Sequence, residues 1–373
     1  MVVWIKNANI ASMDTECAQA SSAVVNDKYF AYVGDEEGAK ACIENLGEPD
    51  VVEVDVQGKR LIPGFNDSHM HYLHYVKTKI HVDLKGTTSM RELISRMKDG
   101  LEHYDPAGGL WFVGEGWNHD YFEDENRFPT KQDLDEITTE YPIMVQRSCS
   151  HVGVLNSKAI EMFDWTTDES VEYIRYAETD EKGELNGVIK ESLFDYFKSK
   201  LPAPSVESLA GMMVEYQGDL FSMGVTSVQS DEYNYTPEGT FFKLQDLLRT
   251  SAERGDLKLR ISGQALYFKP DALQEAFDNG YDHTFGNPTL HISSTKLLAD
   301  GSLGARTALM RKPYADDPTT SGLAIFTQEE LDELVAISHR NNTPAVIHAI
   351  GDKAIEMCLD SIEKARETMP YLS

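Results

Sequence analysis

Short apolar runs, separated by turn-forming residues, fill the first 60 residues of the chain. The runs are VVWIKNANI, SAVVNDKYFAYVG and VVEVDVQGKR, and Asn26 and Asp27 are a candidate turn inside the second run. Runs of this length between turn signals are typical of β-strands. We therefore predict a small β-module for residues 1–60.

From Leu61 onward, apolar runs alternate with segments of helical period. The predicted strands are Leu61–Asp67, Gly224–Gln229, Leu259–Leu266, Ser294–Ala299 and Ala345–Ala349, and the predicted helices between them are Val206–Met223, Gly239–Arg254, Asp271–Asn279 and Gln328–Asn341. Strands that alternate with helices are typical of βα units around a parallel sheet. The pattern thus predicts an α/β fold with five βα repeats in residues 61–373.

A long connection, residues 78–205, separates the first two of these strands. Connections of this length usually carry structure and function of their own. Aromatic residues lie between its charged turns, namely Trp111, Phe112, Trp117, Tyr121, Phe122 and Phe128. We expect an insertion that caps or lines the functional site, and the alternative is a separate core in which these aromatics pack together.

Two histidines, His69 and His71, stand at the end of the first of these strands with one residue between them. Residues two apart on a strand project from the same face, so both side chains can bind one ion. The pair is weak evidence alone, because 11 histidines in 373 residues give about 0.3 such pairs by chance. The alternative is a pair of partly buried histidines bonded to nearby carbonyls.

Two further residues occupy unusual positions on other predicted strands. Lys296 lies inside the apolar run SSTKLLADGS, where an ammonium group is costly unless it is paired or modified. His348 ends the run PAVIHAIGD, and Asp352 is placed to cap the helix that follows. The ends of barrel strands are where α/β barrels present their chemistry. Separate strand ends thus offer four reactive or metal-binding side chains.

Several segments carry a resemblance that covers nearly the whole chain. They are PGFNDSHMH, GVTSV, KLLADGSLGARTA and HAIGDKA, with GWNH at 116–119, PTKQDLD at 129–135, SHVGVLNSKAI at 150–160 and PY at 313–314. In order and spacing they resemble the amidohydrolase superfamily. The resemblance is to the amidohydrolase family 3 branch, which includes N-substituted formamide deformylases and exoenzyme-regulator-like proteins.

The resemblance implies a distorted (β/α)8 TIM-like barrel beside a β-sandwich built from both chain ends. It implies that His69, His71 and Lys296 bind metal, the lysine often as a carbamate that bridges two ions, with His348 on the second ion. Imidazole nitrogens suit Zn²⁺, and a carbamate turns a buried cation into an anion that can neutralise the charge of the metals. We expect one or two divalent ions such as Zn²⁺.

The implied activity is metal-dependent hydrolysis of C–N bonds other than peptide bonds, in N-formyl compounds or other linear or cyclic amides. A metal-activated hydroxide would attack a carbonyl that the metal polarises. In the family, an aspartate at the end of strand eight is the general base and a histidine ends strand six. The sequence stops at Ser373, after the fifth repeat, so we expect an incomplete barrel that is either the N-terminal part of a longer polypeptide or is completed by something else. The second hypothesis is therefore a catalytically inactive regulatory or binding protein that keeps an amidohydrolase-like fold.

Three residues of the insertion are candidate substrate contacts. Trp117 and His119 could line the pocket, and His151, in SHVGVLNS, matches a family histidine, although a structural hydrogen bond explains it equally well. Asp300 could orient a metal ligand from behind or cap the turn DGSLGAR, and we favour the turn. His74 leaves the strand axis and is expected at the rim or in packing.

Composition narrows the class of protein further. A net charge of −28 disfavours nucleic acid, anionic membrane and polyanionic substrates as partners. No long apolar run predicts a membrane span, and the N-terminus does not resemble a signal peptide. The four cysteines, Cys17, Cys42, Cys149 and Cys358, form no CxxC pair and are expected to be reduced packing residues. We predict a cytoplasmic protein that acts on a small amide-type molecule, and we leave a homo-oligomer open.

Overall fold

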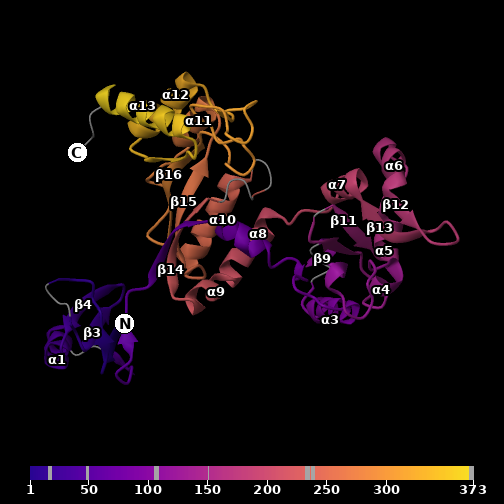
Figure 1. The fold of residues 1–373 in the computed structure, drawn as a ribbon. Coiled ribbons are helices and arrows are strands. Elements are labelled where there is room, and N and C mark those ends of the chain that lie inside the picture. The colour runs from indigo at the N-terminus through magenta and orange to yellow at the C-terminus, as the bar shows by residue number, and fades with distance from the viewer. Residues whose placement is uncertain are drawn as a thin grey trace. The chain divides into compact units, whose positions relative to one another are not determined.

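The computed structural model describes residues 1–15, 19–47, 50–104, 109–149, 151–231, 236 and 240–368, so that Cys17 lies outside the described residues. The chain, drawn in Figure 1, divides into two compact units. One contains Met1–Asp67 with Leu220–Ser227, and the other contains Ser68–Asp219 with Val228–Ser373. No helix in these described ranges is long and apolar enough to cross a membrane.

The first unit is built on a four-stranded sheet in the order β4-β3-β1-β5. The strands are β1 (Val2–Lys6), β3 (Ser22–Asn26), β4 (Tyr29–Gly34) and β5 (Val51–Asp55), and a separate pair joins β2 (Asn9–Ile10) to β6 (Arg60–Leu61). The predicted turn is confirmed, because β3 and β4 pair antiparallel with Asn26 opposite Tyr29. Asp27, in the turn, has a φ of 58°, a left-handed conformation that aspartate tolerates.

The prediction of strands alone is wrong for one segment of this unit, helix α1 (Glu36–Asn45). The Asp35 carboxylate caps the helix by accepting a hydrogen bond from Gly38 N at 2.7 Å. Ala39 buries the inner face of the helix against Trp4 and Val24 of the sheet. The acidic Asp35–Glu36–Glu37 run was the sequence signal for this helix start.

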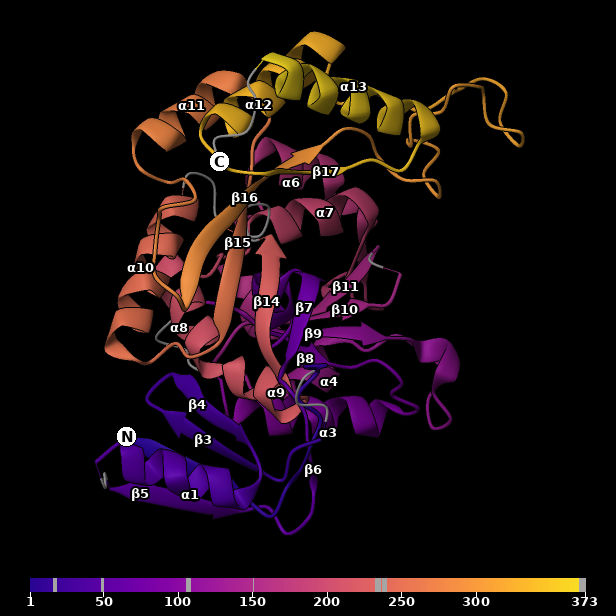
Figure 2. The ribbon, with the colours of Figure 1, turned by 90° about the vertical axis from the view of Figure 1, so that its left-hand side faces the viewer.

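A five-stranded sheet in the order β17-β16-β15-β14-β7 carries the predicted strand ends. Its strands are β7 (Phe65–Met70), β14 (Val225–Asp231), β15 (Arg260–Leu266), β16 (Leu290–Leu298) and β17 (Ala345–His348). Strand β16 is parallel to both β15 and β17, and Figure 2 shows β15 and β16 side by side. The existence of all five strands is confirmed, although β16 begins before the predicted range and β7 lies later, at 65–70 rather than 61–67.

Helices accompany this sheet, and all but α2 lie close to the predicted positions. They are α2 (Tyr72–Lys77), α8 (Val206–Glu215), α9 (Gln217–Ser222), α10 (Phe241–Arg254), α11 (Pro270–Asp278), α12 (Gln328–Arg340) and α13 (Asp352–Thr368). The single helix predicted for 206–223 is divided into α8 and α9. Asp352 is the first residue of α13, and its carboxylate accepts a hydrogen bond from Arg311 N at 2.8 Å, so the predicted capping role is wrong.

Alternate residues of these strands pack against α11, α12 and α13. Ala265, Leu297 and Ile347 share one apolar core with Leu334 of α12 and Met357 of α13. Because successive strand residues point to opposite faces, the residues that flank Leu297 and Ile347 project from the other face of the sheet. Lys296 and His348 are among them.

The insertion has its own six-stranded sheet in the order β12-β13-β11-β10-β9-β8. Its strands are β8 (Val82–Asp83), β9 (Phe112–Trp117), β10 (Ile143–Arg147), β11 (Val152–Leu155), β12 (Ala177–Thr179) and β13 (Leu185–Lys190). Its helices are α3 (Met90–Leu101), α4 (Lys131–Asp135), α5 (Ser157–Met162), α6 (Asp168–Tyr173) and α7 (Glu191–Ser199), with 3-10 turns η2 (His119–Tyr121) and η3 (Ile174–Tyr176).

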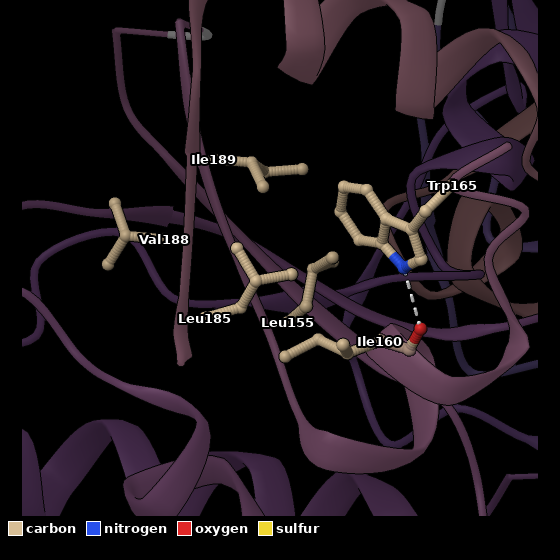
Figure 3. Close-up of a pocket in the computed structure, with 7 residues that line it drawn as sticks. Leu155, Ile160, Trp165, Leu185, Val188 and Ile189 are labelled. Carbon is tan, nitrogen blue, oxygen red and sulfur yellow. Dashed lines mark hydrogen bonds between the residues drawn. The ribbon is translucent and has the colours of Figure 1, made fainter. Parts of the chain in front are cut away.

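The aromatic residues of the insertion mostly form its cores. Phe112, Trp117 and Phe122 are buried together with Phe128 beside them, whereas Tyr121 is exposed. A second core of the insertion contains Leu155 and Ile189, with Trp165 packed against it. A narrow apolar gap lies there between Trp165 and strand β13, and the Trp165 indole N–H donates to Ile160 O at 2.9 Å (Figure 3). This gap is too narrow to hold a water molecule. The alternative prediction of a separate aromatic core is therefore confirmed.

Candidate metal centre

His69 and His71 lie at the carboxyl end of β7. His69 is exposed in the strand, and His71 follows the strand and is half-buried. Their ring centroids are 5.3 Å apart and the ring planes are nearly perpendicular, at 78°. The two imidazoles therefore lie close enough to face one ion.

Strand β14 fixes the orientation of His71. Its Nδ1 lies 3.1 Å from Asp231 O, and because a carbonyl only accepts, Nδ1 carries the proton and Nε2 is the acceptor nitrogen. Ser230 Oγ donates to Met70 O at 3.1 Å and accepts from Tyr72 N at 2.8 Å, so it holds the backbone on both sides of His71. Metal-binding histidines typically donate their other ring N–H to a carbonyl in this way.

Lys296 is buried, with 5% of its surface exposed. Leu266 and Val346 stand directly opposite it on the two neighbouring strands. Within the part of the chain that the structure describes, no hydrogen bond or ion pair reaches the Lys296 side chain. Lysine is almost never buried without a partner. The burial of Lys296 therefore indicates that its amino group is modified or binds a ligand.

His348 lies on the same face as Lys296, at the end of the adjacent strand. Lys296 is opposite Val346, and Leu298 is opposite His348. The side chains of Lys296 and His348 are therefore diagonal neighbours on that face, offset by two residues along the strands. His348 Nε2 is 2.8 Å from Gly301 O, which makes Nε2 the donor and Nδ1 the acceptor nitrogen.

The four predicted ligands thus form two pairs on one sheet. Three strand spacings of about 4.8 Å would separate β7 from β16 by roughly 14 Å in a flat sheet, so only curling brings the pairs to one centre. Among the residues with described positions, no three His, Cys, Asp or Glu side chains gather closely enough to hold a metal ion. His348 therefore does not join His69 and His71 in one three-residue cluster in this structure.

Trp117 and His119 lie at the carboxyl end of β9 in the insertion. Trp117 is fully buried and His119 packs on Phe128, with ring centroids 4.5 Å apart. Trp117 Nε1 and His119 Nδ1 have no hydrogen-bond partner in the described ranges, and neither has Nε of the adjacent Arg147. Sequence reasoning missed Arg147, whose Nη2 donates to Asn118 Oδ1 at 2.7 Å. A role in substrate binding stays a prediction for Trp117 and His119.

His151 stands apart from that pair. It is 64% exposed, and its Nδ1 is 3.4 Å from Glu191 Oε2. Glu191 has a φ of 47°, a strained conformation for a residue with a Cβ. His74 is exposed on α2, as a rim residue would be. His151 also stays a predicted substrate contact.

Asp300 does not cap the turn DGSLGAR, and that favoured expectation is wrong. Its buried carboxylate accepts hydrogen bonds from the backbone N–H groups of Leu309, Ile350 and Gly351. These partners lie in the loop after β16 and the turn after β17, so the carboxylate ties two strand ends together.

Comparison with known proteins decides the family. A model of the amidohydrolase family matches residues 52–372. This chain belongs to the amidohydrolase family. The membership confirms the resemblance drawn from the motifs, and it fits an α/β fold whose parallel strands form a curled half-barrel.

Several amidohydrolase relatives are longer than this chain. YtcJ of Bacillus subtilis (strain 168), whose name assigns it provisionally to the amidohydrolases, is 27% identical over 355 residues, covering 95% of this chain and 64% of YtcJ. The exoenzymes regulatory protein AepA of Pectobacterium carotovorum subsp. carotovorum is 27% identical over 379 residues, covering 99% of this chain and 78% of AepA. The N-substituted formamide deformylase of Arthrobacter pascens is 22% identical over 392 residues, covering 98% of this chain and 66% of that enzyme. This chain thus spans less than two thirds of the length of YtcJ.

A solved structure is similar over almost the whole chain. An uncharacterized metal-dependent hydrolase from Pyrococcus furiosus superposes with a TM-score of 0.70 at 28% identity, covering 98% of this chain and 71% of that one. The fold of this amidohydrolase chain is therefore shared with a metal-dependent hydrolase.

Proposed function

We propose that this chain supplies part of the active centre of a metal-dependent hydrolase that cleaves C–N bonds other than peptide bonds. Membership of the amidohydrolase family supports hydrolysis, and the similarity to a metal-dependent hydrolase supports a divalent ion. The name of the formamide deformylase supports N-formyl or related linear or cyclic amides as substrates. The barrel of eight strands and the β-sandwich are part of this proposal.

The residues present fit one or two divalent ions such as Zn²⁺. His71 and His348 each donate one ring N–H to a backbone carbonyl and so keep the other nitrogen as an acceptor, the arrangement common to histidine ligands. His69 adds a second imidazole at the end of β7. Lys296, buried without a described partner, would as a carbamate provide anionic oxygens for the same ions. This partnerless lysine is the observation that carries the proposal.

A divalent ion bound there supplies Lewis acidity and a hydroxide near neutral pH. The chain's own residues hold and orient the ligands. Ser230 and Asp231 set the His71 ring, and Gly301 sets the His348 ring. Leu266 and Val346 stand opposite Lys296 on the neighbouring strands, and the lysine is buried.

A test uses the full-length natural protein and a panel of N-formyl, linear and cyclic amides. We expect turnover by the wild type and none by Lys296→Ala, with partial rescue by added short-chain carboxylic acids that replace the carbamate. Lys243→Ala is the matched control, because Lys243 is an exposed lysine paired with Glu207 and should keep full activity. Full activity of Lys296→Ala without rescue would refute the carbamate.

A non-catalytic regulatory role is the second candidate, favoured by the name of the relative AepA. It predicts a folded, full-length protein that lacks turnover on every amide of the panel. Turnover that disappears with Lys296→Ala would exclude this second role.

A further inference from the structure

Asp300 joins the carboxyl ends of two adjacent strands. Its side chain is fully buried directly after β16. Oδ2 accepts from Leu309 N at 2.8 Å and from Gly351 N at 2.7 Å, and Oδ1 accepts from Ile350 N at 3.0 Å. A buried carboxyl group is costly unless hydrogen bonds replace its water, and here three backbone donors do so.

The same short segment holds His348 at both its backbone and its ring. Ala299 N, one residue before Asp300, donates to His348 O at 2.9 Å. Gly301 O, one residue after Asp300, accepts the ring Nε2–H at 2.8 Å, and Asp300 Oδ1 itself lies 3.7 Å from Nε2. Gly301 O and Asp300 Oδ1 therefore face the ring Nε2, while Ala299 holds the backbone of the same histidine.

The loop after β16 packs closely against the turn after β17, in van der Waals contact at Gly351. A Cβ on Gly351 would lie only 1.8 Å from Leu309 O. Because Leu309, Ile350 and Gly351 all donate to Asp300, the carboxylate fixes where this contact forms. Moving it would shift Gly301 O relative to the His348 ring.

We propose that Asp300 is a positioning residue for His348. Its carboxylate fixes the two strand ends so that Gly301 O meets Nε2–H and Nδ1 is presented as the acceptor nitrogen. The link to catalysis rests on the proposed function, in which His348 binds metal. The effect on the His348 ring does not rest on it.

The test compares Asp300→Asn with Asp133→Asn in the full-length natural protein. Asparagine has the same shape but must point an NH2 group at one or more of the three backbone donors. Asp133 is a matched control, because it is also buried and hydrogen-bonded but lies in the insertion, where it binds Arg127 and Thr130. Imidazole ¹⁵N shifts at about pH 8, above the ordinary histidine range, report the tautomer of His348, whose signals are assigned with His348→Gln.

We expect the Nε2–H tautomer for His348 in the wild type and in Asp133→Asn, and a mixture of tautomers in a folded Asp300→Asn. Zinc affinity, measured by competition with a chromophoric chelator, should fall about 10–100-fold in Asp300→Asn and stay unchanged in Asp133→Asn. Unchanged His348 shifts in Asp300→Asn would overturn the proposal. The Nδ1–H tautomer in the wild type would also overturn it, even if the variant does not fold.

The two proposals fail separately. A wild-type chain that binds no zinc would contradict the metal centre, whereas the ¹⁵N shifts would still decide whether Asp300 positions His348.

Discussion

Replacing Asp133 by asparagine should destabilise the insertion by about 2–3 kcal/mol. The Asp133 carboxylate accepts from Arg127 Nη1 and Nη2 at 2.6 and 2.8 Å, and from Thr130 N and Oγ1 at 2.7 and 2.8 Å. Charge-assisted bonds of this kind contribute roughly 1.5–3 kcal/mol each. The hydrogen bonds from Arg127 contribute less than this range to the stability, because the Arg127 side chain is 42% exposed and solvent screens its pairing with Asp133. Asparagine keeps one acceptor oxygen, but its NH2 group replaces the other and faces the N–H and O–H donors of Arg127 and Thr130.

Denaturant unfolding followed by tryptophan fluorescence measures this loss. In a Trp4→Phe background the remaining tryptophans, Trp111, Trp117 and Trp165, all lie in the insertion and report on it alone. Glu125→Gln is the matched control, since Glu125 binds the same Arg127 but is 52% exposed, and should cost at most about 0.5 kcal/mol. Equal losses for the two variants would refute the reasoning.

The same reasoning gives the pH dependence. Burial acts to raise the pKa of Asp133, but hydrogen bonds from Arg127 and Thr130 are stronger together and hold the pKa below its usual range. A lowered folded pKa stabilises the protein above the unfolded pKa of about 3.9, and this stability is lost as the pH falls through the folded pKa. The difference between wild type and Asp133→Asn should therefore be full at neutral pH and shrink in acid below about pH 4. A constant difference down to pH 2 would contradict this assignment.

Two further predictions concern thiols and packing. Partial burial acts to raise the pKa of the exposed Cys149 thiol, but a hydrogen bond from Arg147 lowers this pKa below its ordinary value. Burial, with a smaller contribution from the Asp300 charge, raises the pKa of the Cys358 thiol to about 11. Iodoacetamide near neutral pH should thus label Cys149 well before Cys358, as peptide mass spectrometry would show. The variant Arg147→Gln should slow the labelling of Cys149. Faster labelling of Cys358 than of Cys149 would contradict the burial of Cys358. Gly351→Ala should lower the melting temperature, because its Cβ would meet Leu309 O at 1.8 Å, and an unchanged melting temperature would show that this contact is not tight.

Periodicity predicted the strand ends of the sheet well. The strands β14, β15 and β17 lie within two residues of their predicted bounds, because apolar runs between turn signals reflect burial directly. The first strand was misplaced, because Pro63 and Gly64 interrupt the apolar run and β7 begins only after them.

The partners of the candidate ligands could not be read from the sequence. His71 meets a carbonyl 160 residues away and His348 meets one 47 residues away. Backbone carbonyls carry no signature of residue type, so pattern alone does not predict such contacts. Asp300 was misjudged for the same reason, since its partners lie up to 51 residues along the chain.

Trp117 shows a different limit of sequence reasoning. Its aromatic body and polar N–H suit either a pocket wall or a core, and the structure buries it fully among Phe112, Phe122 and Phe128. Its Nε1 has no hydrogen-bond partner among the residues that the structure describes.

Metal content tests the central claim most directly. The full-length natural protein is reconstituted with zinc and bicarbonate, freed of unbound metal and assayed by elemental mass spectrometry, beside variants with His69→Ala and His348→Ala. The proposed centre predicts about one to two zinc ions per chain in the wild type and a clear loss in each variant. Less than about a tenth of an equivalent in the wild type would contradict the proposed metal centre.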